Sequence, residues 1–121
     1  MTTEHNTPAF TNLDFKGSLI IEPDSLQPLS GVDSASVERV VNAIGAWIQK
    51  VPVDSVKISA FTDPEAANWQ ETVIDIHVAA NEDEAVLLWN NLSRTIDEAK
   101  KDLPESQKDL LNSHLGISLS W

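Results

Sequence analysis

A chain of 121 residues that carries a net charge of −11 and no cysteine excludes several classes of protein at once. Without cysteine there is no disulfide, thiolate metal site, iron–sulfur cluster or cysteine nucleophile. The charge arises from 19 acidic and 8 basic side chains, so nucleic acid and anionic membranes should be repelled on average. The length and an apolar content of 41% suit one globular domain.

The N-terminal region divides into a tail and a first strand. Residues 1–12 are predicted to be a flexible tail, and residues 13–121 a single α+β domain. Alternating apolar residues predict a strand over about residues 13–22. Its apolar face would carry Leu13, Phe15, Leu19 and Ile21. Pro23 should end this strand because proline donates no backbone hydrogen bond.

The clearest pattern in the chain predicts a first helix after Asp33 or Ser34, either of which is a good N-cap. Apolar residues then recur at helical spacing until Pro52 stops the helix. This stripe consists of Val37, Val40, Val41, Ile44, Trp47, Ile48 and Val51. We expect Trp47 to lie in the core.

Two alternating segments, around residues 56–61 and 71–78, predict a β-hairpin. If its turn spans residues 62–68, then Phe61 and Trp69 are cross-strand partners. The core side of the second strand would carry Thr72, Ile74, Ile76 and Val78.

The last third of the chain predicts two helices and a strand. Asn81 and Glu84 resemble a capping box at the start of a long helix. The buried stripe of that helix is predicted to be Ala85, Leu88, Trp89, Leu92, Ile96 and Ala99. A shorter helix should run to about His114, with Gly116 as its C-cap. A strand with Ile117, Leu119 and Trp121 on one face ends the chain.

This order of elements is typical of the ferredoxin-like split βαβ fold. We therefore expect a four-stranded antiparallel sheet in the spatial order 4-1-3-2, with two long helices and one short helix on one face. The opposite face would carry Ile20, Lys57, Ser59, Phe61, Glu71, Val73, Asp75, His77, Ser118 and Ser120. Such a fold supports many functions, so it does not indicate an activity by itself.

One candidate polar site comprises Glu71, Asp75 and His77, which share one side of one strand. Carboxylates beside an imidazole can bind a metal ion or transfer protons. The simpler interpretation is a solvated sheet face, with Ser59 opposite Glu71 and Lys57 close to both carboxylates. We predict that these residues do not form a working site.

One candidate partner surface comprises Phe61, Trp69, Val73 and Ile20 on the same face. Exposed aromatic side chains can anchor a protein partner. Alternatively, the two aromatic residues clamp the hairpin or pack under the N-terminal segment.

Recognised catalytic motifs are missing from the sequence. It has no glycine-rich phosphate loop, no nucleophile elbow and no paired-histidine zinc motif, so no cofactor or metal is expected.

Our first hypothesis is a non-enzymatic interaction or regulatory module in the cytoplasm, either a homodimer or a partner of another cytosolic protein. The alternative is a small-molecule enzyme or binder that uses Glu71, Asp75 and His77. A nucleic-acid mimic that occupies a nucleic-acid-binding protein is a weaker third hypothesis. No binding to nucleic acid or membrane is expected.

Overall fold

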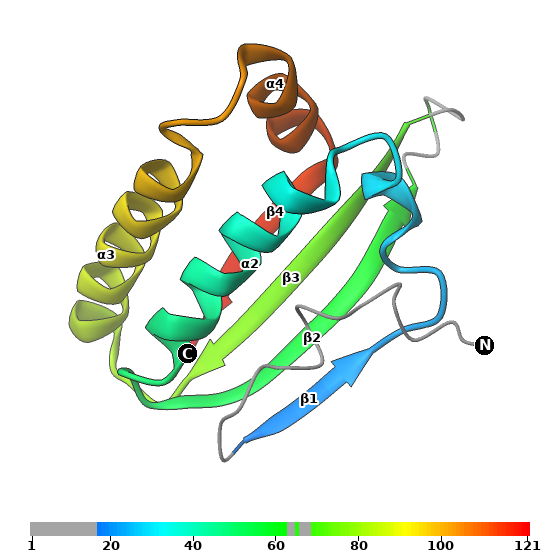
Figure 1. Ribbon diagram of the computed structural model, residues 1–121. Coiled ribbons are helices and arrows are strands. Elements are labelled where there is room, and N and C mark those ends of the chain that lie inside the picture. The colour runs from blue at the N-terminus through cyan, green and yellow to red at the C-terminus, as the bar shows by residue number, and fades with distance from the viewer. Residues whose placement is uncertain (1–16, 63–64, 66–68) are drawn as a thin grey trace.

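The computed structural model describes residues 17–62, 65 and 69–121. The helices and strands appear in Figure 1 and are, in chain order, β1 (Ser18–Ile21), the 3-10 turn η2 (Gln27–Leu29), α2 (Ser34–Ile48), β2 (Val53–Thr62), β3 (Gln70–Val78), α3 (Glu82–Lys100), α4 (Glu105–His114) and β4 (Leu115–Ser120). The predicted tail, the first residues of the predicted first strand and most of the predicted hairpin turn lie outside the described residues.

The sheet has four strands in the order β1-β2-β3-β4. β1 pairs with β2 in parallel, β2 pairs with β3 antiparallel, and β3 pairs with β4 in parallel. The fully antiparallel sheet with the order 4-1-3-2 is therefore wrong, and the ferredoxin-like fold is not confirmed. The reason is that each helical connection returns the chain to the strand directly beside the one it left. Side-chain alternation reveals which face of a strand is buried, but not which strand lies next to it.

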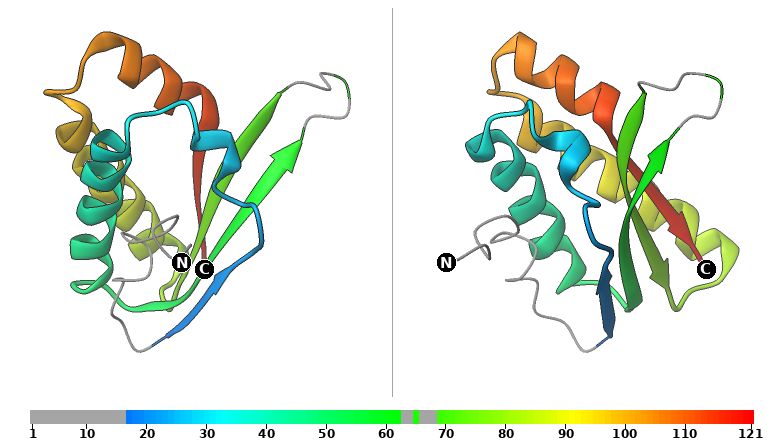
Figure 2. Two further views of the ribbon diagram at one scale, coloured as in Figure 1. Left: turned by 45° about the vertical axis from the view of Figure 1, so that its right-hand side comes forward. Right: turned by 90° about the vertical axis from the view of Figure 1, so that its right-hand side faces the viewer.

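The three α-helices that the structure describes lie on one face of the sheet, as Figure 2 shows from two directions. This placement confirms the predicted α+β architecture with one covered face. The predicted core side of β3 is also confirmed. The four residues predicted to face the helices are all buried: Thr72, Ile74, Ile76 and Val78. No helix in the described ranges is both long and apolar enough to cross a membrane.

The predicted stripe of α2 packs against the sheet and against α3. Five of its residues are buried: Val40, Val41, Ile44, Trp47 and Ile48. The indole Nε1–H of Trp47 donates to Asn91 Oδ1 of α3 over 3.1 Å. A buried indole needs such an acceptor, so this hydrogen bond fixes how α2 and α3 lie against each other.

The N-terminus of α3 is a capping box, as predicted. Glu84 N donates to Asn81 Oδ1 over 2.9 Å, and Asn81 N donates to Glu84 Oε1 over 3.1 Å. The expectation that Trp89 is a core residue is wrong, because Trp89 is 40% exposed. At about 100° per residue, Trp89 lies near the edge of the buried stripe. Helical periodicity does not reveal how far the sheet beneath that stripe extends.

Helix α4 is tied to both longer helices. Gln107 Oε1 accepts from the Asp33 backbone N–H at the start of α2 over 2.8 Å. Lys100 Nζ of α3 donates to Asn112 Oδ1 over 2.8 Å. Burial lowers the pKa of Lys100, against the opposing effect of the Asp97 carboxylate. Gly116 does not cap α4 as predicted, since the C-cap is Leu115 in an extended conformation and β4 begins there.

Truncation of the two helix tryptophans should separate a core residue from a peripheral one. Trp47→Ala should lower the free energy of unfolding by about 3–5 kcal/mol, because it removes a large buried side chain. Trp89→Ala should cost about 1–2 kcal/mol, because less apolar surface of this residue leaves water on folding. Denaturant melts followed by circular dichroism measure both values, and equal losses would contradict the difference in burial.

Candidate functional site

The face of the sheet opposite the helices is the candidate functional surface, here called the outer face. None of the described helices covers it (Figure 2). Strand pairing aligns its side chains in rows that cross the sheet. The first row is Ser18, Ser55, His77 and Ser120; the second is Ile20, Lys57, Asp75 and Ser118; the third is Ser59, Val73 and Gly116; the fourth is Phe61 and Glu71.

The predicted polar residues share this face but do not converge on one point. Glu71 and Asp75 are four residues apart on β3, which separates their Cα atoms by about 13 Å. Val73 lies between them. Glu71 is opposite Phe61 and not Ser59 as the sequence suggested, because Ser59 pairs with Val73.

The carboxylate of Glu71 lies over the backbone of β4. A Cβ atom added to Gly116 would be 3.1 Å from Glu71 Oε2. The missing side chain of Gly116 thus leaves the space in which this carboxylate rests. Glu71 is directed toward β4 in this way, while Asp75 accepts a hydrogen bond from Ser118 Oγ one row further on from Gly116.

The imidazole of His77 lies between Ser120 and Asp54. His77 Nδ1 is 3.0 Å from Ser120 Oγ, a hydrogen-bonding distance. His77 Nε2 is 3.8 Å from Asp54 Oδ2, which is an ion-pair distance when the ring is protonated but too long for a hydrogen bond. Asp54 lies where the pairing of β2 with β3 shifts its register between Val53 and Ser55.

Sequence reasoning placed Ser118 and Ser120 on the outer face but missed them as partners of Asp75 and His77. Their contacts depend on the parallel pairing of β4 with β3, and the predicted strand order did not include that pair. Asp54 was missed because its position depends on an irregularity in β2 that alternation does not reveal.

Lys57 neutralises a different carboxylate from the expected ones. Its Cα atom is paired with Asp75, yet its Nζ lies 3.5 Å from Glu22 Oε2. Both side chains of this ion pair are about half exposed, so the pair adds little to stability. Glu71 is two rows from Lys57, too far for the contact that the sequence suggested.

The predicted pairing of Phe61 with Trp69 is wrong. Thr62 pairs with Gln70, so Trp69 lies before the start of β3 and Phe61 is opposite Glu71. The Trp69 ring stacks on His114, with centroids 5.3 Å apart and 29° between the planes. His114 Nδ1 is 2.8 Å from the Gln70 carbonyl oxygen, which holds the imidazole in place under the indole.

Apolar side chains are exposed on and beside the outer face. Ile20 is 52% exposed, Phe61 48% and Trp69 38%, while Val73 is partly buried. Phe61 and Val73 are diagonal neighbours on adjacent strands, within reach of each other. The described charged residues of this face are mainly acidic, since Glu22, Asp54, Glu71 and Asp75 are accompanied by the cation Lys57.

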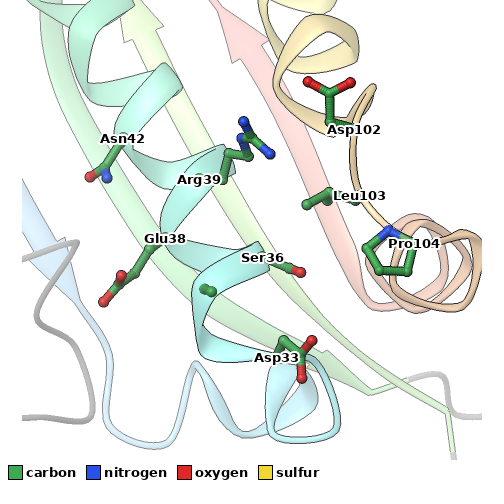
Figure 3. A pocket seen from close by; sticks show the side chains of 9 residues that line it. Asp33, Ser36, Glu38, Arg39, Asn42, Asp102, Leu103 and Pro104 are labelled. Atoms are coloured by element: carbon green, nitrogen blue, oxygen red, sulfur yellow. The ribbon is translucent and has the colours of Figure 1, made fainter.

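A separate open depression of about 490 Å³ lies on the helical side, between α2 and the segment that joins α3 to α4. Figure 3 shows Arg39 of α2 extending toward the side on which Asp102 and Leu103 lie. Three of the nine lining residues are acidic, Asp33, Glu38 and Asp102, and the rest apart from Arg39 are uncharged. The depression contains none of the predicted site residues.

Together these features define an α+β domain with a mixed sheet, one face of which the described helices leave uncovered. No protein-family model, curated protein or solved structure matched this chain. In the portion of the chain that the structure describes, no group of three or more histidine, cysteine or acidic residues could hold a metal ion.

A metal titration tests the separation of the predicted polar residues. The protein should not bind zinc one-to-one in a manner that depends on His77. Glu71 and Asp75 are four residues apart on β3 and cannot reach a common ion. Isothermal titration calorimetry of the wild type and of His77→Ala measures this. Tight stoichiometric binding that His77→Ala abolishes would show that the side chains rearrange into a site.

Proposed function

We propose that this protein is a non-enzymatic interaction module that binds another protein through its outer face. The observation that carries the proposal is the exposure of Ile20, Phe61 and Trp69 on and beside a sheet face that the described helices leave uncovered. A regulatory role and a cytoplasmic location belong to the same proposal.

The apolar side chains supply anchors for a partner. Aromatic residues contribute strongly to protein interfaces because a large apolar area is buried with little loss of side-chain freedom. Phe61 is nearly half exposed, with Val73 as its diagonal neighbour. Trp69 is held near the same end of the hairpin by its stacking on His114. A preorganised side chain loses less entropy on binding.

The charge of the outer face indicates the chemistry of the partner. Glu22, Asp54, Glu71 and Asp75 share this face with the apolar residues, whereas Lys57 is already paired with Glu22. Interfaces place complementary charge around an apolar centre. The partner should therefore present an apolar patch with a basic rim, and added salt should weaken its association.

A small-molecule enzyme or binder is the second candidate, and one observation favours it. Ser120, His77 and Asp54 place a hydroxyl, an imidazole and a carboxylate in succession, the order found where a base activates a nucleophile. The sheet surface around them is open, which gives a substrate little enclosure. A fluorophosphonate probe that labels the wild type, but not Ser120→Ala or His77→Ala, would favour this candidate.

Partner capture tests the interaction module directly. The double variant Ile20→Ser/Phe61→Ser should lose at least about 30-fold in affinity for a protein that the wild type retains from a cell extract, because buried interface anchors contribute about 2 kcal/mol or more. Binding of that protein, once purified, is measured by biolayer interferometry at low and high salt.

The matched control is Leu87→Ser, which removes a side chain of α3 that is 70% exposed. This variant should bind as the wild type does, since α3 lies on the other side of the sheet. Circular dichroism confirms that each variant is folded. Equal binding by the double variant and the wild type would place the partner elsewhere, and retention of no protein by the wild type would also count against the proposal.

A further inference from the structure

Within the described part of the chain, the outer edge of β4 is an unprotected sheet edge. β4 pairs with β3 on one side, and no described strand pairs with the other. Edge strands are commonly blocked by charged residues, proline or bulges, because their free backbone groups recruit further strands. β4 has the sequence LGISLS, with none of these residues, and its register with β3 shows no shift.

The opposite edge of the sheet differs in its length and in the residues that follow it. β1 has only 4 residues, and the chain continues directly into Glu22 and Pro23. A short strand that is followed by a charge and a proline is a poor template for strand addition. An added strand therefore has its best site at β4.

We propose that β4 pairs antiparallel with β4 of a second copy of this chain, across a two-fold axis, so that two sheets become one sheet of eight strands. This inference concerns residues other than those of the proposed partner surface. It places the contact between the two copies at a strand edge and not on the outer face.

The helix-covered faces of the two copies must lie on the same side of the joined sheet. This requirement restricts the register in which the two β4 strands can pair. An axis at Ser118 places Gly116 of one copy opposite Ser120 of the other, and Ile117 opposite Leu119. Among the residues of β4 itself, the outer side of the junction then has only small side chains, and the inner side only apolar ones. An axis at Ile117 would set Ser120 against His114, which belongs to α4. The register centred on Ser118 avoids that conflict.

Charge explains why the added strand should be a second copy. Two chains of net charge −11 repel each other unless they meet at an uncharged surface. The outer-face carboxylates nearest the junction are those of Asp75, which accepts a hydrogen bond from Ser118 Oγ, and Glu71, which lies over Gly116 of β4. With the axis at Ser118, the Cα atoms of the two Asp75 residues would be separated by three strand spacings, about 14 Å, and those of the two Gly116 residues by about 13 Å along the strands. Backbone separations of this size exceed the Debye length of about 8 Å at physiological salt, so salt screens the repulsion between the two sets of carboxylates. A basic peptide would gain no attraction from β4 itself, because the strand is uncharged.

Exposed apolar side chains beside β4 enlarge this surface. Val86 is 50% exposed, Trp89 40% and Trp121 54%. Trp89 lies about 200° around α3 from Asn91, and Asn91 faces α2 through Trp47. The flank of α3 that carries Trp89 is therefore turned away from α2 and toward the β4 edge of the sheet.

Trp121 lies at the same end of the molecule as Val86. It follows Ser120, which pairs with His77 near the end of β3, and Figure 2 shows the C-terminus close to the beginning of α3. Stable interfaces bury about 1,200–2,000 Å² in total, more than a strand pair alone supplies. The exposed side chains of Val86, Trp89 and Trp121 provide additional apolar area.

Sedimentation velocity over about 1–200 μM protein tests the assembly. The wild type should sediment as a dimer at the higher concentrations. Ser118→Lys should be a monomer, because it sets like charges directly opposite each other at the axis, whereas the control Ser118→Thr should remain a dimer. A wild type that is monomeric throughout, or a folded Ser118→Lys variant that dimerises as the wild type does, would overturn the proposal.

A cross-linking experiment tests the register. The natural chain has no cysteine, so each cysteine variant has one thiol. Directly opposed residues of antiparallel strands have Cα atoms about 4.5–5.5 Å apart, which suits a disulfide. Ser118→Cys should oxidise to a covalent dimer, while the control Ser59→Cys, in the middle of the outer face, should not. Efficient cross-linking through Ser59→Cys and not through Ser118→Cys would place the interface on the sheet face and overturn the edge pairing.

The two proposals fail separately. Ile20→Ser/Phe61→Ser should still sediment as a dimer, because these residues are remote from β4. The Ser118→Lys monomer should still bind the protein partner through Phe61 and Ile20. A dimer without partner binding, or partner binding without a dimer, therefore indicates which surface has been assigned wrongly.

Discussion

The alternation of side chains along β3 is the constraint on which the rest of the structure depends. β3 is a central strand that pairs with β2 on one side and β4 on the other. Its even-numbered residues from Thr72 to Val78 are buried beneath the helices, while its odd-numbered residues from Glu71 to His77 lie on the outer face. A shift of one residue would exchange these sets and place Asp75 in the core, where an unpaired charge is very costly. The register of β3 therefore sets both the core and the composition of the candidate surface.

The helical layer is held together by a few specific polar contacts in addition to its apolar core. The Trp47–Asn91 hydrogen bond orients α2 against α3, and Gln107 satisfies a backbone N–H at the start of α2. These contacts all lie on one side of the sheet. The described helices leave the other side of the sheet uncovered, and a rigid sheet presents its side chains in a fixed arrangement. Such preorganisation favours binding.

The two surfaces that we assign differ in chemistry. The outer face combines apolar anchors with acidic residues, which suits a partner of opposite charge. The edge of β4 is uncharged and self-complementary, which suits a second copy. Pairing at the edge would extend the outer face across both copies and give each dimer two equivalent partner sites. Two linked sites can raise the overall avidity without any new contact, provided that the partner can reach both.

The sequence by itself determined most of the local structure: the α2 stripe, the hairpin, the capping box of Asn81 and Glu84, and the buried side of β3. It also determined which residues lie on the outer face, because alternation is a local property. Only the tertiary structure decided the strand order, the parallel pairs, the exposure of Trp89 and the stacking of Trp69 on His114. It likewise decided that Ser118 contacts Asp75, that Ser120 contacts His77, and that Lys57 pairs with Glu22 instead of with Glu71 or Asp75. These features depend on which elements meet across the chain, and a repeating pattern within one element does not specify its neighbours.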